Sequence, residues 1–291
     1  MVVIHRSFRM QDCANRALVL QAMGIDHAVE RDVLVWRVLV PRYEERRARE
    51  QLQLYEAENR GARSTVTYTA PRPGALIGAV IWAYILFTVF TLQGRYGFGF
   101  DWVAAGRVDV AAIRGGEGWR AVTALTLHAD AAHLFVNIGM GAVFGSLLAR
   151  EIGVGLAWLL ILIGGTVGNL MNVIVQRPWH TAIGASTAVF AALGLLAAYL
   201  WTGKRLIRDS WARRWAPVVG AVVMLAWLGT GGERTDIVAH LTGFLAGFGM
   251  GAVLGRVVQQ LAADPMRQWL LGAVSVLFVT LAWGFAFAKY G

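Results

Sequence analysis

Five polar residues of this sequence have types and positions that could together support nucleophilic attack on a carbonyl group. Ser186 offers a hydroxyl that can attack a carbonyl carbon, and His240 offers an imidazole that can accept the hydroxyl proton. His133 and Asn137 offer N–H groups that can stabilise negative charge on the carbonyl oxygen, and His128 precedes them. Taken singly, each residue is more simply interpreted as a helix cap, a packing residue or an interhelical hydrogen-bond partner. Taken together, they favour a nucleophile with its base and oxyanion donors.

Seven apolar runs must position these residues. Each run approaches the roughly 20 residues that a helix needs to cross about 30 Å of hydrocarbon. We expect membrane spans at residues 75–92, 131–149, 154–175, 185–201, 215–230, 238–257 and 269–288. Because successive spans alternate in direction, the second, fourth and sixth spans begin on the same side of the membrane. The polar residues above, together with Asp236, lie at or near these three beginnings, so the sequence predicts that they share one depth.

Small residues predict that the fourth and sixth spans approach each other closely. Glycine occupies every fourth position of the sixth span, at Gly243, Gly247, Gly251 and Gly255. The fourth span is rich in alanine and also carries glycine. Such faces let helix backbones pack tightly in a membrane, so we expect Ser186 and His240 to come within hydrogen-bond distance.

Composition indicates a membrane protein rather than a soluble one. Of the 291 residues, 57% are hydrophobic and 15% are charged, with a mean hydropathy of +0.52. The net charge of +9 comes largely from arginines beside apolar runs, and no nucleic-acid-binding module accompanies them, so we expect no nucleic-acid partner. Cys13 is the only cysteine, which excludes an internal disulfide and a cysteine-based zinc cluster. We expect neither a metal nor a cofactor.

The polar residues 1–62 predict a small soluble α+β domain before the membrane part. Its expected elements are a helix that begins near Met10 and stops at Gly24, β-prone runs at 27–30 and 33–40, and a charged stretch at 41–58. The order α-β-β-α predicts a two-stranded sheet backed by helices. Residues 63–74, with proline, serine and threonine, predict a linker.

Basic residues predict the orientation in the membrane. The loop after the fourth span has five cations and one acid, which is typical of a cytoplasmic loop. We therefore expect a cytoplasmic N-terminus, consistent with the lack of an apolar signal-like run in the first 25 residues. The long outer segment 93–130 should fold onto the membrane surface, and residues 229–236 are a candidate mobile cap over the site.

Four motifs of this sequence resemble those of the rhomboid intramembrane serine proteases, and they occur in the same order as in that family. The motifs are Trp119-Arg120, His128-x4-His133-x3-Asn137, Gly184-Ala185-Ser186 and Ala239-His240-x2-Gly243-x3-Gly247. The resemblance implies an all-α polytopic membrane protein with a six-helix core at 75–260 and a seventh transmembrane helix at 266–291. The α+β domain resembles the small cytoplasmic domain of some bacterial rhomboids, which implies a multi-pass protein of the bacterial inner membrane.

The resemblance also implies roles for the site residues. Ser186 would be the nucleophile and His240 the general base of a dyad that lacks a carboxylate. His133, Asn137 and the backbone N–H of Ser186 would bind the oxyanion, and His128 and Gly184 would support them. The substrates would be transmembrane proteins that reach the site from the lipid bilayer. The oligomeric state is not predicted.

The sequence departs from the family pattern at two positions and leaves two alternatives open. Thr187 replaces the glycine usual after the serine, and Phe190 replaces a tyrosine often found one turn later. One alternative is a catalytically inactive rhomboid-like protein that binds transmembrane clients. The other is a transporter or channel, against which the sequence shows no paired acids at mid-membrane and no repeat of its halves.

Overall fold

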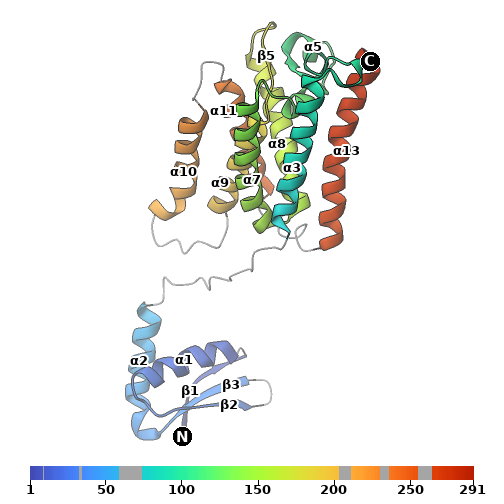
Figure 1. The fold of residues 1–291 in the computed structure, drawn as a ribbon. Coiled ribbons are helices and arrows are strands. Elements are labelled where there is room, and N and C mark those ends of the chain that lie inside the picture. The colour runs from blue at the N-terminus through green and yellow to red at the C-terminus, as the bar shows by residue number, and fades with distance from the viewer. Residues whose placement is uncertain (9, 33–34, 59–73, 203–210, 230–235, 255–263) are drawn as a thin grey trace. The chain divides into compact units, whose positions relative to one another are not determined.

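The chain divides into two compact units, Met1–Thr67 and Tyr68–Gly291, which are considered separately. The computed structural model describes residues 1–8, 10–32, 35–58, 74–202, 211–229, 236–254 and 264–291 (Figure 1). Of the linker expected at 63–74, only Gly74 is among the described residues. Residues 230–235 of the candidate cap at 229–236 also lie outside the described residues. So do residues 203–210 of the loop after the fourth span, which include Lys204, Arg205 and Arg208.

In its described residues, the N-terminal unit has a three-stranded antiparallel sheet and two α-helices. Its elements are β1 (Val2–Ser7), α1 (Met10–Ala22), β2 (Ala28–Asp32), β3 (Val35–Val40), the 3-10 helix η1 (Arg42–Glu44) and α2 (Glu45–Glu58). The strand order is β1-β3-β2. Val38 and Val40 on the central strand are fully buried and form a core with residues of both helices, Cys13 and Leu52 among them.

The expectation of a two-stranded sheet that follows a leading helix was therefore wrong. Strand β1 comes first in the chain and pairs with β3 on the side opposite to β2. Val2 lies opposite Val40, and Ser7 lies opposite Trp36. The β-branched run at Val2, Val3 and Ile4 is the local signal for this strand.

The described residues of the second unit include seven long helices, one in each range predicted as a span. They are α3 (Ala75–Gly94), α7 (Ala131–Ile152), α8 (Val154–Val175), α9 (Ser186–Thr202), α10 (Trp211–Gly229), α11 (Ile237–Leu254) and α13 (Pro265–Tyr290). Among the described residues, α3, α7, α8 and α13 are long and apolar enough to cross a membrane, and α9, α10 and α11 contain shorter apolar stretches.

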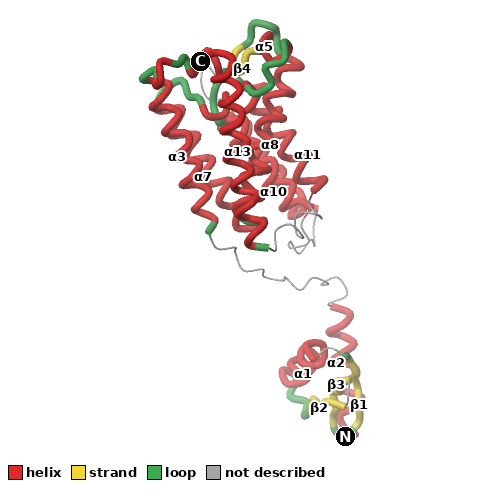
Figure 2. The backbone as a smooth tube through the Cα atoms, turned by 90° about the vertical axis from the view of Figure 1, so that its right-hand side faces the viewer, coloured by secondary structure: helices red, strands yellow, loops and turns green. Residues whose placement is uncertain are grey.

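The segment between α3 and α7 folds compactly over one end of these helices. It contains η2 (Gly97–Gly99), α4 (Trp102–Gly106), β4 (Val108–Asp109), α5 (Val110–Arg114), α6 (Arg120–Thr123) and η3 (Ala124–Thr126). Strand β4 pairs with β5 (Thr181–Ala182), which precedes α9. The C-terminus lies at the same end of the unit (Figure 2). The segment therefore bridges the beginnings of α7 and α9.

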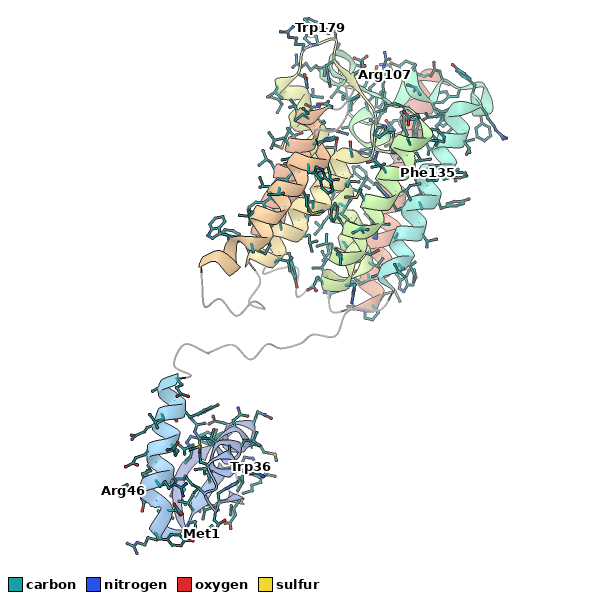
Figure 3. The ribbon with its side chains drawn as sticks, turned by 60° about the vertical axis from the view of Figure 1, so that its left-hand side comes forward. Met1, Trp36, Arg46, Arg107, Phe135 and Trp179 are labelled. Atoms are coloured by element: carbon teal, nitrogen blue, oxygen red, sulfur yellow. The ribbon has the colours of Figure 1, made fainter. Side chains whose placement is uncertain are left out.

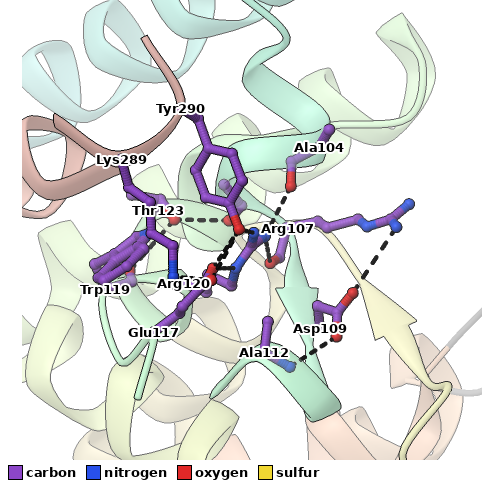
Figure 4. A network of polar contacts seen from close by, with 11 residues as sticks. Ala104, Arg107, Asp109, Ala112, Glu117, Trp119, Arg120, Thr123, Lys289 and Tyr290 are labelled. Atoms are coloured by element: carbon purple, nitrogen blue, oxygen red, sulfur yellow. Dashed lines mark hydrogen bonds and ion pairs between the residues drawn. The ribbon is translucent and has the colours of Figure 1, made fainter. Parts of the chain in front are cut away.

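A network of ion pairs and hydrogen bonds around the buried Glu117 fastens this segment to the end of α13 (Figure 4). The Glu117 carboxylate accepts hydrogen bonds from Arg120 Nε at 2.6 Å, Lys289 Nζ at 2.8 Å and Tyr290 OH at 2.8 Å. Burial alone would raise the pKa of Glu117, but the hydrogen bonds from these three neighbours lower it to about 2. The carboxylate therefore stays charged across the physiological pH range.

Glycines bring α9 and α11 into backbone contact. A Cβ added at Gly247 of α11 would lie 2.1 Å from the carbonyl oxygen of Ala191 on α9. A Cβ at Gly194 of α9 would lie 2.3 Å from the carbonyl oxygen of Phe244 on α11. Neither position has room for a side chain. The interface therefore holds the two helices at a spacing that only glycine permits.

Candidate active site

The structure brings the Ser186 hydroxyl and the His240 imidazole together. Ser186 is the first residue of α9, and His240 lies in the first turn of α11. The distance between Ser186 Oγ and His240 Nε2 is 2.8 Å. The other ring nitrogen, Nδ1, lies 2.9 Å from the carbonyl oxygen of Gly229 at the end of α10. Because a carbonyl can only accept, Nδ1 carries the proton and Nε2 can accept the proton of the serine hydroxyl.

Phe190 lies against the imidazole from one turn further along α9. Its ring centroid is 4.5 Å from that of His240, with an angle of 40° between the planes. Phe190 is buried and has no hydroxyl, so it can restrict the imidazole only by packing. The ring therefore keeps an aromatic surface at this position.

Thr187 packs away from the serine hydroxyl, between two helices. A Cβ added at Gly168 of α8 would lie 2.8 Å from the Thr187 Cγ2 methyl, and one at Gly243 of α11 would lie 3.0 Å from it. The methyl thus fills a gap between α8 and α11. Thr187 also borders the cavity described below, but its methyl is taken up by these contacts.

His133 and Asn137 reach the same site from the first two turns of α7. The Asp130 carboxylate caps this helix and accepts a hydrogen bond from the His133 backbone N–H at 2.8 Å. Asn137 is buried, and its Nδ2 donates to the His133 carbonyl at 2.9 Å. An amide nitrogen carries two hydrogens, so this bond leaves Asn137 a second donor.

Gly184 makes room for the His133 ring beside the serine. Its φ of +136° is a conformation that residues with a Cβ rarely adopt. A Cβ at this position would lie 2.8 Å from His133 Nε2 and 3.6 Å from Ser186 Oγ. Gly184 therefore allows both the turn into α9 and the close approach of the imidazole.

His128 supports the backbone just before the serine. It is fully buried, and its Nε2 accepts a hydrogen bond from the Ala185 N–H at 3.4 Å. Burial lowers the pKa of His128 to about 3, so its imidazole is neutral and can accept. The backbone of His128 is held by the side-chain amide of Gln93, which accepts from its N–H at 3.2 Å and donates to its carbonyl.

These residues border a cavity of about 970 Å³. Its lining includes Ser186, His240, His133, Asn137 and Gly184. Arg107 also lines it, and Figure 3 shows this residue at the same end of the helices as Trp179. The cavity therefore brings a hydroxyl, two imidazoles and a side-chain amide together in one space.

The Trp119-Arg120 pair lies elsewhere, in the network around Glu117. Arg120 donates to the carbonyl oxygens of Ala104 and Arg107 at 2.8 and 3.1 Å. Neither member of the pair lines the cavity, so both act on the shape of the segment before α7.

The structure adds a cluster that the sequence interpretation missed. Asp236 caps α11, and its Oδ1 accepts from the Ala239 N–H at 3.0 Å. Its Oδ2 accepts from Asn172 Nδ2 at 2.8 Å and from His180 Nε2 at 2.7 Å. A buried asparagine in an apolar span was the available signal for Asn172, because such residues require a partner. The partner itself could not be read from spacing.

No three described side chains of His, Cys, Asp and Glu come together as a metal site.

The apolar helices and their buried polar groups define an integral, multi-pass membrane protein. Residues 115–257 match the family model of the Rhomboid domain. The chain belongs to the rhomboid family.

Curated relatives agree with this assignment. "Rhomboid-like protease 3" of Toxoplasma gondii is 29% identical over 143 residues, 49% of this chain and 54% of the relative. "RHOMBOID-like protein 4" of Arabidopsis thaliana is 32% identical over 152 residues, 51% of this chain and 37% of the relative. "Rhomboid protease GluP" of Bacillus subtilis is 29% identical over 185 residues, 64% of this chain and 34% of the relative. The matched regions thus span about a third to a half of these three relatives, two of which are named as proteases.

Proposed function

We propose that this protein is an intramembrane serine endopeptidase that cleaves membrane-protein substrates with a dyad of Ser186 and His240. The observation that carries the proposal is the 2.8 Å contact between Ser186 Oγ and His240 Nε2, with Nδ1 held by the Gly229 carbonyl. A backbone carbonyl takes the orienting position that a carboxylate holds in a Ser-His-Asp triad. It fixes the tautomer without adding a charge to the membrane.

The dyad can carry out both halves of amide hydrolysis. Ser186 Oγ attacks the carbonyl carbon while His240 Nε2 takes its proton. The imidazolium then gives this proton to the leaving amine nitrogen, and the C–N bond breaks to leave an acyl ester on the serine. Water attacks the ester with His240 as base, and the carboxylic acid product and the free serine are released.

The oxyanion would form at the beginning of α9. The N-terminus of a helix has unpaired N–H groups and a partial positive charge, both of which favour an anion. His133 and the second N–H of Asn137 add side-chain donors to the backbone N–H of Ser186. Removing one such donor costs roughly 3 to 4 kcal/mol in the transition state, so Asn137→Ala should slow cleavage about a hundredfold or more.

The proposed substrate is a transmembrane helix that reaches the cavity from the lipid. A helix hydrogen-bonded along its whole length offers no extended amide to attack, so the substrate must unwind locally near the site. Small, helix-weakening residues should mark the cleaved region. We further propose that α3 and α7 to α11 form six spans, that α13 is a seventh, and that the N-terminus is cytoplasmic in a bacterial inner membrane.

The test is cleavage of a single-span substrate by the reconstituted protein. Wild type and the control Ser275→Ala, a serine on α13, should cleave, whereas Ser186→Ala and His240→Ala should not. A serine-hydrolase probe should label the first pair only. Equal product from all four proteins would overturn the proposal. Client binding without cleavage would favour an inactive rhomboid-like protein, and proton-coupled flux that survives Ser186→Ala would favour a transporter.

A further inference from the structure

The Asp236 carboxylate joins three segments that build the site. It lies at the start of α11, and its two hydrogen-bond partners come from α8 and from the connection between α8 and α9. Asn172, on α8, is 1% exposed. His180 lies six residues before Ser186 in the chain, directly before β5, so the carboxylate links the segment that leads to Ser186 with the helix that carries His240.

This junction acts on the turn of α11 that holds His240. The backbone N–H of His240 donates to the Asp236 carbonyl at 3.1 Å, so the two residues close the first turn of the helix. The Asp236 side chain caps the same turn through Ala239. Any displacement of Asp236 would therefore move the His240 backbone and with it the imidazole.

The partners of Asp236 do more than a helix cap requires. One carboxylate oxygen suffices for the cap, as at Asp101, whose Oδ1 accepts from the Ala104 N–H at 2.9 Å. At Asp236 the second oxygen takes two further donors, and the 2.7 Å distance to His180 is that of a short, charge-assisted hydrogen bond. The second oxygen thus serves to fix α11 against its neighbours.

We propose that His180 is a positioning residue for the His240 base and acts through Asp236. This inference rests on the proposed function. His180 pulls the first turn of α11 toward the segment before Ser186 and so sets the separation of Oγ and Nε2. A displacement of about 1 Å in a catalytic group can cost about a hundredfold in rate, so a modest loosening should be measurable.

Three variants separate the parts of this arrangement. His180→Phe keeps a ring but removes the donor, and His180→Gln restores an N–H close to the place of Nε2. Asp236→Ser keeps a capping oxygen and removes the tether. Asp101→Ser is the matched control, because it makes the same exchange at a cap without a tether.

The experiment measures kcat and KM for a single-span substrate, the rate of labelling by a fluorophosphonate, and thermal unfolding. Labelling requires the dyad but no transmembrane substrate. His180→Phe and Asp236→Ser should each lower kcat and the labelling rate about tenfold or more, with KM within about twofold of wild type. His180→Gln should recover most of the loss, Asp101→Ser should lose nothing, and the double variant should be no slower than either single variant.

Several results would overturn the inference. These are wild-type labelling by His180→Phe, a loss confined to KM, a His180→Gln variant as slow as His180→Phe, or losses that multiply in the double variant. If His180→Phe does not fold, Asp236→Ser against Asp101→Ser decides the question. Failure of the wild type itself to label would instead overturn the proposed function, and this inference with it.

Discussion

Helices α10 and α11 both contribute to the same imidazole, but they are attached to the fold in different ways. Helix α11 carries His240 and meets α9 through glycines whose Cα atoms lie against carbonyl oxygens. Helix α10 carries the Gly229 carbonyl, and a Cβ added at its Gly220 would meet nothing within 4 Å. Ser186 and His240 therefore lie on two closely packed helices, α9 and α11. Only Gly229, whose carbonyl accepts from His240 Nδ1, lies on α10.

Among the described residues, α10 contacts the hydrophobic core through side chains. Met224, Leu225 and Leu228 pack against the core around Phe190. On its outer face Trp227 is 78% exposed, and Pro217 within the helix removes one backbone hydrogen bond. Contacts between side chains can adjust by rotamer changes, whereas backbone contacts at glycine cannot. The difference indicates that Ser186 and His240 lie on helices in backbone contact, whereas the Gly229 carbonyl lies on a helix packed through side chains.

Matched glycine substitutions test this difference most directly. Gly247→Ala places a Cβ 2.1 Å from the Ala191 carbonyl oxygen, so we expect a loss of about 3 kcal/mol or more in the free energy of unfolding. Gly220→Ala meets no atom and improves helix propensity, so stability should stay equal or rise by up to about 1 kcal/mol. Thermal unfolding in detergent measures both. Equal midpoints for the two variants would show that α10 and α11 are held alike.

The pH dependence of stability tests the Glu117 network that joins α13 to the segment before α7. The Glu117 pKa of about 2 lies below its ordinary value of 4.5, so the charged form stabilises the fold above pH 4.5. This stability should be lost as the pH falls from about 4.5 to about 2, by up to about 3 kcal/mol. Glu117→Gln should remove that part of the pH dependence in unfolding measurements. The exposed Glu50→Gln serves as control, and an unchanged profile for Glu117→Gln would contradict the network's role.

Phe190 tests the place where α9, α10 and α11 meet. Its ring contacts His240, and its Cζ would lie 3.3 Å from a Cβ at Gly229. Phe190→Ala should lower kcat about tenfold, equivalent to about 1.4 kcal/mol, because the imidazole loses its packing partner. Phe190→Tyr should keep the wild-type rate if the added hydroxyl fits. Full activity in Phe190→Ala would show that packing against Phe190 is not needed to orient the imidazole.

Removing one methyl group from Thr187 tests the close packing of α9 against α8 and α11. Thr187→Ser removes the Cγ2 that fills the gap between Gly168 and Gly243. We expect a loss of about 1 kcal/mol in stability with cleavage retained. Thr280→Ser, at an exposed position of α13, should change little. A gain in cleavage by Thr187→Ser would instead indicate that the methyl obstructs the serine.

Long apolar runs made the helices of the membrane unit readable from the sequence, and the order of four motifs identified the family. The spacing of the glycines of α11 also predicted which face of the helix packs against α9, because this spacing matches the helical repeat. Strand β1 was missed because its partner β3 begins 28 residues after β1 ends, and a short strand is recognised by its pairing. The bonds from Asp236 to Asn172 and His180 span 64 and 56 residues, and Glu117 reaches Tyr290 over 173. Such contacts depend on the finished fold and leave no local pattern.

The Gly229 carbonyl makes the base depend on the helix next to it. Nδ1 of His240 finds its acceptor on the last residue of α10, the helix held by adjustable contacts. If α10 swings outward, the acceptor leaves, and the imidazole can turn or exchange its tautomer. The serine then loses its proton acceptor as well. Under the proposed function, the capacity to hydrolyse a peptide bond would thus depend on how closely the end of α10 lies against α11.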